Sequence, residues 1–287
     1  MDRLLPLRTR LKKFQSTSGA LWEVVERDYF LSWILHVIAQ DPGLRIVFKG
    51  GTALKKCYFG AYRFSEDLDF TALPDAPQSF EASMNRIVQN LSNQVNAIEP
   101  FHVTCEKYRE KEPHPEGQEA YVFKGKFEWH RASHVKVFVE ISRNEKICFP
   151  PIFRAIHHEY GEKLDGQVLC YSLEEIVLEK LRGILQQTQK IHEKEWSRSR
   201  VRDYYDLWRI LTAYQHEIDT VNIPPHLITK CSYKNVSFTG ASSFFDEAMV
   251  AFVKKTWQQW LAPLVSDLPA SELVLRELKP LISKMVD

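Results

Sequence analysis

A short apolar segment that runs into two consecutive glycines constrains the fold of this chain more than any other feature. Residues 44–48, Leu-Arg-Ile-Val-Phe, have the length and composition of a buried strand, and Gly50-Gly51 follows almost at once. Glycine lets the chain turn sharply, and residues 52–60 are then predicted to form a short helix that ends at a glycine. The backbone N–H groups at such a turn can hold a triphosphate.

Two aspartates separated by one residue follow this turn. Asp67 and Asp69 lie in a segment of strand character, residues 67–71, so both carboxylates project from one face. Two like charges this close repel unless a cation lies between them, and Mg²⁺ binds one or two protein carboxylates together with substrate phosphate oxygens. The pair therefore predicts a site for Mg²⁺ or Mn²⁺ that serves phosphoryl transfer.

Each of these two features also has a simpler interpretation. Asp67 and Asp69 alone fit a solvated strand end, because this spacing often arises by chance. Gly50-Gly51-Thr52 alone fits a tight turn in which Thr52 is the N-cap of the helix. The combination, with the acidic pair fifteen residues after Thr52, is more specific and favours a functional site.

The chain resembles a known family in two segments, Lys49-Gly50-Gly51-Thr52-Ala53-Leu54 and Arg63-Phe64-Ser65-Glu66-Asp67-Leu68-Asp69-Phe70. This is the AbiEii nucleotidyltransferase family, toxins of type IV toxin–antitoxin systems that include the MenT toxins. The family belongs to the DNA polymerase beta superfamily of nucleotidyltransferases. The resemblance implies a metal-dependent transfer of a nucleotide from an NTP.

The resemblance also implies roles for single residues. Gly51-Thr52 corresponds to the superfamily's Gly-Ser turn, and Asp67 and Asp69 correspond to its metal ligands. A third carboxylate is expected on a later strand, where Glu140 is the candidate. The alternative for Glu140 is an exposed strand residue that pairs with Lys136 on the same face.

The nucleotide itself is expected to bind at the turn and at the segment before the acidic pair. Gly50, Gly51 and Thr52 would hold the triphosphate, and Arg63 and Ser65 would contact the nucleotide phosphates. The alternative for Arg63 and Ser65 is a structural role, in which both side chains form hydrogen bonds that stabilise their loop.

A lysine is predicted to point inward from a later helix. The capping box Ser172-Leu173-Glu174-Glu175 begins a helix that runs to about Gln189, and Lys180 falls between Ile176 and Ile184 on its apolar face. A buried lysine needs an anion, which is either a carboxylate of the fold or the phosphates of a ligand, unless the side chain extends to solvent. The resemblance favours the ligand, because the family has a functional lysine on this helix.

Two further aspartates follow in the segment Arg202-Asp203-Tyr204-Tyr205-Asp206-Leu207-Trp208, which resembles the family's Arg/Lys-Asp-x-x-Asp-Leu motif. Asp203 and Asp206 are one helical turn apart and share a face. Spacing alone fits a solvated face with capping roles. The resemblance favours Asp203 as the aspartate that completes the active site, and Asp206 as a less favoured partner.

Residues 190–202 form the clearest basic segment of the chain, with the cations Lys190, Lys194, Arg198, Arg200 and Arg202. Such a run is usually a solvated loop. Beside an active site it would guide an RNA backbone, and Trp196 would stack on a base.

The remaining pattern predicts an α+β chain of two lobes. The first lobe, residues 1–150, is expected to have the nucleotidyltransferase fold, a mixed sheet with helices that carries the metal and triphosphate site. The second lobe, residues 151–287, is expected to be mostly helical and to complete the active-site cleft. The predicted elements are helices at 21–39, 79–96, 172–189, 248–261 and 271–285, and strands at 44–48, 67–71, 101–108, 121–129, 135–142 and 168–171.

Composition limits the class of protein. Lys+Arg 38 against Asp+Glu 37 gives a net charge of +1, so any nucleic-acid partner must meet a local patch rather than a global field. The five cysteines are far apart and odd in number, which fits reduced thiols rather than disulfides or a zinc site. No apolar leader or membrane span is found, and we expect a cytoplasmic location without a membrane partner.

Together these features predict a nucleotidyltransferase that moves an NMP from an NTP to an acceptor, expected to be an RNA (tRNA) 3′ end, as the toxin of a toxin–antitoxin or phage-defence system with a cognate antitoxin. Two alternatives stay open. The same site would serve a kinase-like phosphotransferase, or the chain would be a nucleotide- or RNA-binding module without turnover.

Overall fold

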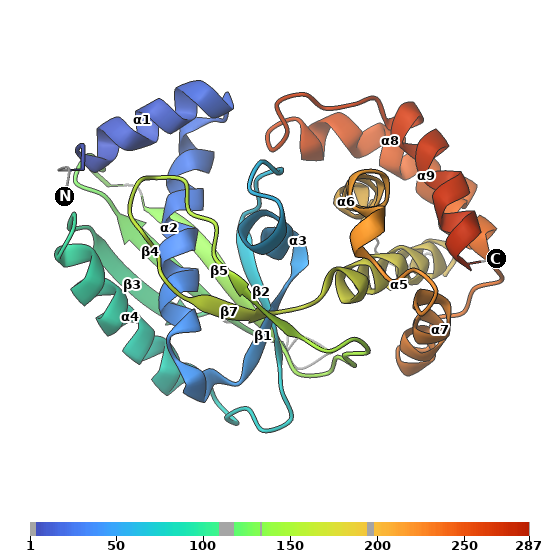
Figure 1. Cartoon of the computed structure of the whole chain (residues 1–287), viewed down its shortest axis with the longest axis horizontal. Coiled ribbons are helices and arrows are strands. Elements are labelled where there is room, and N and C mark those ends of the chain that lie inside the picture. The colour runs from blue at the N-terminus through green and yellow to red at the C-terminus, as the bar shows by residue number, and fades with distance from the viewer. Residues whose placement is uncertain (1–3, 109–117, 133, 194–197, 287) are drawn as a thin grey trace. The chain divides into compact units, whose positions relative to one another are not determined.

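The computed structural model describes residues 4–108, 118–132, 134–193 and 198–286 (Figure 1). The chain divides into two compact units, the first of residues 1–145 and 151–170, the second of residues 146–150 and 171–287. The chain thus enters the second unit briefly before the predicted boundary at 150, returns to the first, and leaves it at residue 171.

The first unit is built on one mixed sheet, which has seven strands within the described residues. The strands, in the spatial order β3-β4-β5-β2-β1-β7-β6, are β1 (Ile46–Lys49), β2 (Asp67–Ala72), β3 (His102–Lys107), β4 (Glu119–Lys126), β5 (Val135–Ser142), β6 (Ile152–Ala155) and β7 (Gln167–Cys170). The pairs β2–β5 and β1–β7 are parallel and the other neighbours are antiparallel. The predicted α+β class with a mixed sheet is confirmed.

Alternation of side chains explains why β5 forms at the centre of this sheet. Val135, Val137, Val139 and Ile141 are all buried, as their period of two predicted, and the side chains between them are more exposed. In β2 the same alternation buries Leu68 and Phe70 and leaves both aspartates half-exposed. The sheet therefore presents the acidic pair on its less buried face.

The helices of the first unit are α1 (Leu7–Ser18), α2 (Trp22–Ala39), α3 (Gly50–Ala53) and α4 (Glu81–Asn96), with short turns η1 (Pro42–Leu44) and η2 (Leu54–Tyr58). The helix α2 packs on the sheet, with Phe30, Leu31 and Ile34 fully buried. The predicted short helix after the glycines is one α-helical turn, α3, followed by the π-helical turn η2.

The second unit is helical, as predicted. It contains α5 (Leu173–His192), α6 (Val201–Ala213), α7 (Ile223–Tyr233), α8 (Glu247–Leu261) and α9 (Ser271–Val286), with short turns η3 (Gln215–Glu217) and η4 (Ala241–Phe245). Ser172 is the N-cap of α5, and its hydroxyl accepts a hydrogen bond from the Glu175 N–H at 3.3 Å. All five cysteines are free thiols. Among the described helices, none has the length and apolar composition to cross a membrane.

Candidate active site

The glycine turn joins β1 to α3 in the first unit and contacts the acidic pair directly. Gly50 has a φ of +82°, a conformation that side-chain-bearing residues rarely adopt. A Cβ at this position would lie 2.5 Å from the carboxylate Oδ2 of Asp69, whose backbone is paired with Lys49 across β1 and β2. Only glycine leaves room for this carboxylate.

The second glycine of the turn, Gly51, leaves space for a guanidinium in the same way. A Cβ at Gly51 would lie 3.1 Å from Cζ of Arg63, closer than side chains normally approach. Arg63 is buried, with 4% of its surface exposed, and its Nη1 donates to the carbonyl of Phe64 at 3.2 Å. The turn therefore has an acidic side chain against Gly50 and a basic one against Gly51. Ser65 lies half-exposed between Arg63 and β2.

Thr52 ties the turn to the acidic strand. The residue is buried, and its hydroxyl donates to the backbone carbonyl of Asp67 at 2.5 Å. The alternative in which Thr52 caps the helix is wrong, because α3 begins at Gly50 and its N-cap position is Lys49. The hydroxyl thus fixes the distance between the glycine turn and the start of β2.

Glu140 lies next to the acidic pair on the neighbouring strand. Asp69 and Glu140 are register partners in the parallel pair β2–β5, so Asp67, Asp69 and Glu140 share one face of the sheet. A carboxylate oxygen of Glu140 accepts a hydrogen bond from the side-chain amide of Gln118. Among the described residues, no group of three or more His, Cys, Asp or Glu side chains is arranged to hold a metal. Two carboxylates fit Mg²⁺ or Mn²⁺ when substrate oxygens supply the remaining ligands.

In the second unit, Lys180 points inward as its place on α5 predicted. It is 7% exposed, and its Nζ lies 3.0 Å from Oδ1 of Asp203 and 2.6 Å from Oδ2 of Asp206. Asp206 is fully buried, whereas the Asp203 side chain is 16% exposed and also meets Nη1 of Arg200 at 3.4 Å. The buried lysine thus has carboxylate partners within the fold, and Asp203 is the partner that reaches solvent.

Residues 34–279, most of the chain and parts of both units, match the family model described as "Nucleotidyl transferase AbiEii toxin, Type IV TA system". The chain belongs to the AbiEii nucleotidyltransferase toxin family. Its activity is therefore that of a nucleotidyltransferase. Comparison with curated protein sequences gives no match.

A solved structure is similar in fold to this AbiEii-family chain. The nucleotidyltransferase toxin MenT4 from Mycobacterium tuberculosis H37Rv aligns with a TM-score of 0.59 and 18% sequence identity, over 93% of this chain and 85% of the other. At this identity the likeness concerns the fold. The aligned region, 93% of the chain, includes residues of both units, which therefore both share the fold of that nucleotidyltransferase.

Two buried lysines near the glycine turn were not predicted as part of the AbiEii site. Lys55 and Lys56, in η2, are 3% and 1% exposed, whereas Lys49 is half-buried and lies 3.9 Å from Glu145. Two consecutive lysines in the apolar sequence Ala-Leu-Lys-Lys-Cys-Tyr-Phe are the signal that sequence reasoning missed. Burial of both side chains requires anionic or carbonyl partners nearby.

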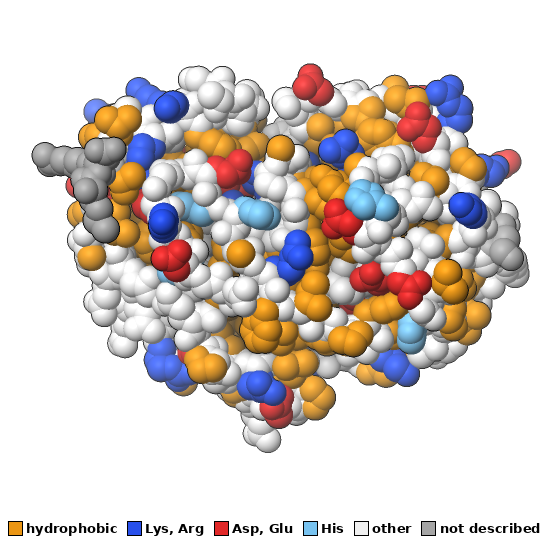
Figure 2. All heavy atoms as spheres, viewed as in Figure 1, with side chains coloured by type: hydrophobic (Ala, Val, Ile, Leu, Met, Phe, Trp, Pro, Cys, Tyr) orange, Lys and Arg blue, Asp and Glu red, His pale blue; other side chains and the backbone are white. Residues whose placement is uncertain are grey.

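The basic segment predicted to bind RNA is only partly described. Residues 194–197, with Lys194 and Trp196, lie outside the described residues. Arg198 is exposed, and the guanidinium of Arg202 lies 5.9 Å from the ring centre of Trp260, which is 47% exposed. Figure 2 shows acidic and basic side chains interspersed on the visible face, in keeping with the net charge of +1.

Proposed function

We propose that this AbiEii-family nucleotidyltransferase transfers an NMP from an NTP to an RNA acceptor, with a tRNA 3′ end as the expected acceptor. The observation that carries the proposal is the packing of Asp69 against Gly50 and of Arg63 against Gly51. It brings a carboxylate, which we propose binds the metal, and a guanidinium, which we propose binds phosphate, to the same two-residue turn.

Asp67 and Asp69 are proposed to hold Mg²⁺ or Mn²⁺, with Glu140 beside them on β5. When bound, the metal neutralises charge on the triphosphate and lowers the barrier to in-line attack on the α-phosphorus. The register of β2 and β5 supports this assignment, because it puts the three carboxylates on one face.

The glycine turn and Arg63 are proposed to bind the triphosphate. The backbone N–H groups of Gly50 and Gly51 are proposed to donate to the phosphates at the sharp turn before α3, and the half-exposed Ser65 is proposed to add a hydroxyl between Arg63 and β2. Thr52 acts on the turn rather than on the nucleotide, because its buried hydroxyl is bonded to Asp67. The Arg63 fork suits phosphate oxygens, which accept two parallel hydrogen bonds.

Lys180 and Asp203 are proposed to be required for transfer. Lys180 supplies a cation held by two carboxylates, and the position of Asp203 nearer to solvent leaves it accessible to a substrate group. Asp206, which is fully buried, is then proposed to have the structural role of holding Lys180 in place.

As the toxin of a type IV system, the protein is proposed to act in the cytoplasm and to be opposed by an antitoxin. The RNA acceptor is proposed to meet the basic segment 190–202, whose Arg202 guanidinium lies 5.9 Å from the ring centre of the exposed Trp260. Lys and Arg side chains give salt-dependent attraction to an RNA backbone, and aromatic rings stack on unpaired bases.

The experiment that tests the reaction uses total RNA, Mg²⁺ and each NTP labelled at either the α- or the γ-phosphate. We expect label from the α-phosphate in RNA, with release of pyrophosphate. Label transferred only from the γ-phosphate would mean phosphorylation and would contradict the proposal. Nucleotide binding without transfer of either label would contradict the proposal and support the alternative of a binding module without turnover.

A further inference from the structure

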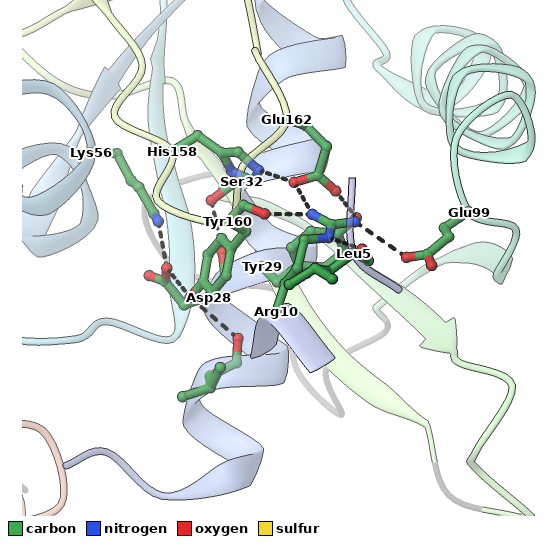
Figure 3. Close-up of polar contacts among 11 residues, drawn as sticks. Leu5, Arg10, Asp28, Tyr29, Ser32, Lys56, Glu99, His158, Tyr160 and Glu162 are labelled. Carbon is green, nitrogen blue, oxygen red and sulfur yellow. Dashed lines mark hydrogen bonds and ion pairs between the residues drawn. The ribbon is translucent and has the colours of Figure 1, made fainter. Parts of the chain in front are cut away.

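The buried pair Asp28 and Lys56 links the helix α2 to the π-helical turn that follows the glycines (Figure 3). Each side chain is 1% exposed, and Lys56 Nζ lies 2.6 Å from Asp28 Oδ2. The hydroxyl of Tyr160 donates to the same oxygen at 2.8 Å. Two segments far apart in sequence thus meet on one carboxylate.

The glycine turn needs such an anchor because its helix is very short. The four residues of α3 and five of η2 form fewer than three turns, and an isolated helix of this length is unstable. The π-helical turn closes with a bond from the Phe59 N–H to the Leu54 carbonyl at 2.8 Å. The position of this segment must therefore be set by contacts outside it.

Lys56 supplies such contacts from both its side chain and its backbone. Besides the ion pair with Asp28, its carbonyl accepts a hydrogen bond from the His157 N–H at 2.7 Å. The preceding residue, Lys55, donates to the Gly60 carbonyl at 3.2 Å and lies 3.3 Å from Glu159. The end of the π-helical turn is therefore fixed to α2 and to residues 157–160.

Stability alone does not explain a buried ion pair here. Desolvating two charges is expensive, and an apolar pair of similar volume is often as stable or more so. Burial by itself would raise the pKa of Asp28, but the charges of Lys56 and Lys55 outweigh it and hold the pKa below its ordinary value, so the carboxylate stays ionised. In some proteins, a buried polar or ionic pair fixes the geometry between two elements, which an apolar pair does not do.

We propose that Asp28 and Lys56 are positioning residues for the glycine turn. By fixing η2 to α2, the pair holds the turn where Asp69 packs on Gly50 and Arg63 packs on Gly51. Neither residue contacts substrate in this account. The inference rests on the proposed role of the turn in binding the triphosphate.

The test replaces both charges at once, with Asp28→Leu and Lys56→Met in one protein, so that no unpaired buried charge remains. Hydrogen–deuterium exchange of the amides of residues 50–59 and the kcat and KM of NMP transfer are measured beside the melting temperature. We expect exchange in the turn to rise about tenfold, and kcat to fall about 100-fold because the turn is misplaced. The melting temperature is expected to remain near that of the wild type.

The matched control is another buried pair in the same network. Arg10 Nη1 lies 2.5 Å from Glu162 Oε2 and connects α1 to the 156–166 segment, without a contact to η2 (Figure 3). The double substitution Arg10→Met with Glu162→Gln is expected to lower the melting temperature and leave the exchange rates of residues 50–59 and the kcat unchanged. Equal effects of both double substitutions on the turn would overturn the proposal.

Two further outcomes keep the inference separate from the proposed function. If wild-type protein transfers no NMP, the proposed function fails, and the exchange rates alone decide whether the pair positions the turn. If the double variant does not fold, Asp28→Asn with Lys56→Met takes its place, since it removes both charges and keeps a side-chain oxygen that accepts the hydrogen bond from Tyr160. Faster exchange at residues 50–59 in that variant supports the proposal, and wild-type exchange there overturns it.

Discussion

The carboxylate of Asp69 lies directly against the Cα of Gly50, so close that a methyl group on Gly50 would come within 2.5 Å of Oδ2. The two residues are nineteen positions apart, on the turn after β1 and on β2. This contact makes the glycine a requirement of the acidic site rather than only of the turn.

Gly50→Ala is therefore expected to damage both the turn and the site. Alanine at a φ of +82° is strained by about 1–3 kcal/mol, and its methyl group displaces the Asp69 carboxylate. We expect NMP transfer to fall at least about 100-fold. Gly60→Ala is the control, because a Cβ at Gly60 meets nothing within 4 Å. Similar activity in both variants would show that the contact has no catalytic value.

Arg63→Lys is expected to weaken nucleotide binding while the protein stays folded. Lysine keeps the charge beside Gly51 but loses the planar fork that matches phosphate oxygens. We expect the KM for NTP to rise about tenfold, with Arg45→Lys, on an exposed pair with Asp75, as the control. An unchanged KM in the Arg63 variant would favour the purely structural role.

The two carboxylate partners of Lys180, Asp203 and Asp206, are expected to differ in their effects on stability and on activity. Asp206→Asn removes the fully buried partner, leaves Lys180 poorly compensated, and is expected to destabilise the second unit by about 3–5 kcal/mol. Asp203→Asn removes the partner nearer to solvent and is expected to abolish NMP transfer with a smaller loss of stability. Thermal melts and transfer assays on both variants check this, and an active Asp203→Asn protein would argue against a functional role for Asp203.

Glu162 is expected to make the first unit sensitive to acid. Burial alone would raise its pKa, but hydrogen bonds from His158, Arg10 and Tyr29 lower the pKa from its ordinary value of 4.5 to about 2. A lowered carboxyl pKa stabilises the fold above pH 4.5, and this contribution, on the order of 3 kcal/mol, is lost as pH falls towards 2. Glu162→Gln should therefore be less stable at pH 7 and should approach the wild type near pH 2. A stability gap that stays constant with pH would contradict this assignment.

Local patterns in the sequence predicted the helices and strands whose own residues have a regular spacing or a capping motif. The alternation Val135, Val137, Val139, Ile141 identified β5, and the capping box at Ser172 identified the start of α5. The same helical register predicted that Lys180 points inward, which its burial confirms. In each case the relevant signal lies within one element.

Features that depend on contacts distant in sequence were not predicted. Strand β6 has four residues without a buried alternation, and its pairing with β7 over residues 152–170 returns the chain to the first unit beyond the predicted boundary at residue 150. The helix α1 (Leu7–Ser18) was not predicted. Asp28 and Lys56 are twenty-eight residues apart, and neither residue alone indicates the other.

In the candidate site, too, features within one element were predicted, and features that depend on distant contacts were not. Sequence spacing put Asp67 and Asp69 on one face of a strand, but only the register of β2 with β5 brings Glu140 beside Asp69. Likewise, the one-turn spacing of Asp203 and Asp206 predicted a shared face, whereas their common partner Lys180 comes from another helix.

The most direct test of the central claim is NMP transfer from an α-labelled NTP by Asp69→Asn, beside Asp75→Asn in the same unit. Asparagine keeps the size of the side chain against Gly50 and removes the negative charge proposed to hold the metal, whereas Asp75 is 59% exposed and pairs with Arg45. We expect transfer by the folded Asp69 variant to fall by at least about 100-fold, while the Asp75 variant retains full activity. Wild-type transfer by a folded Asp69→Asn protein would contradict it.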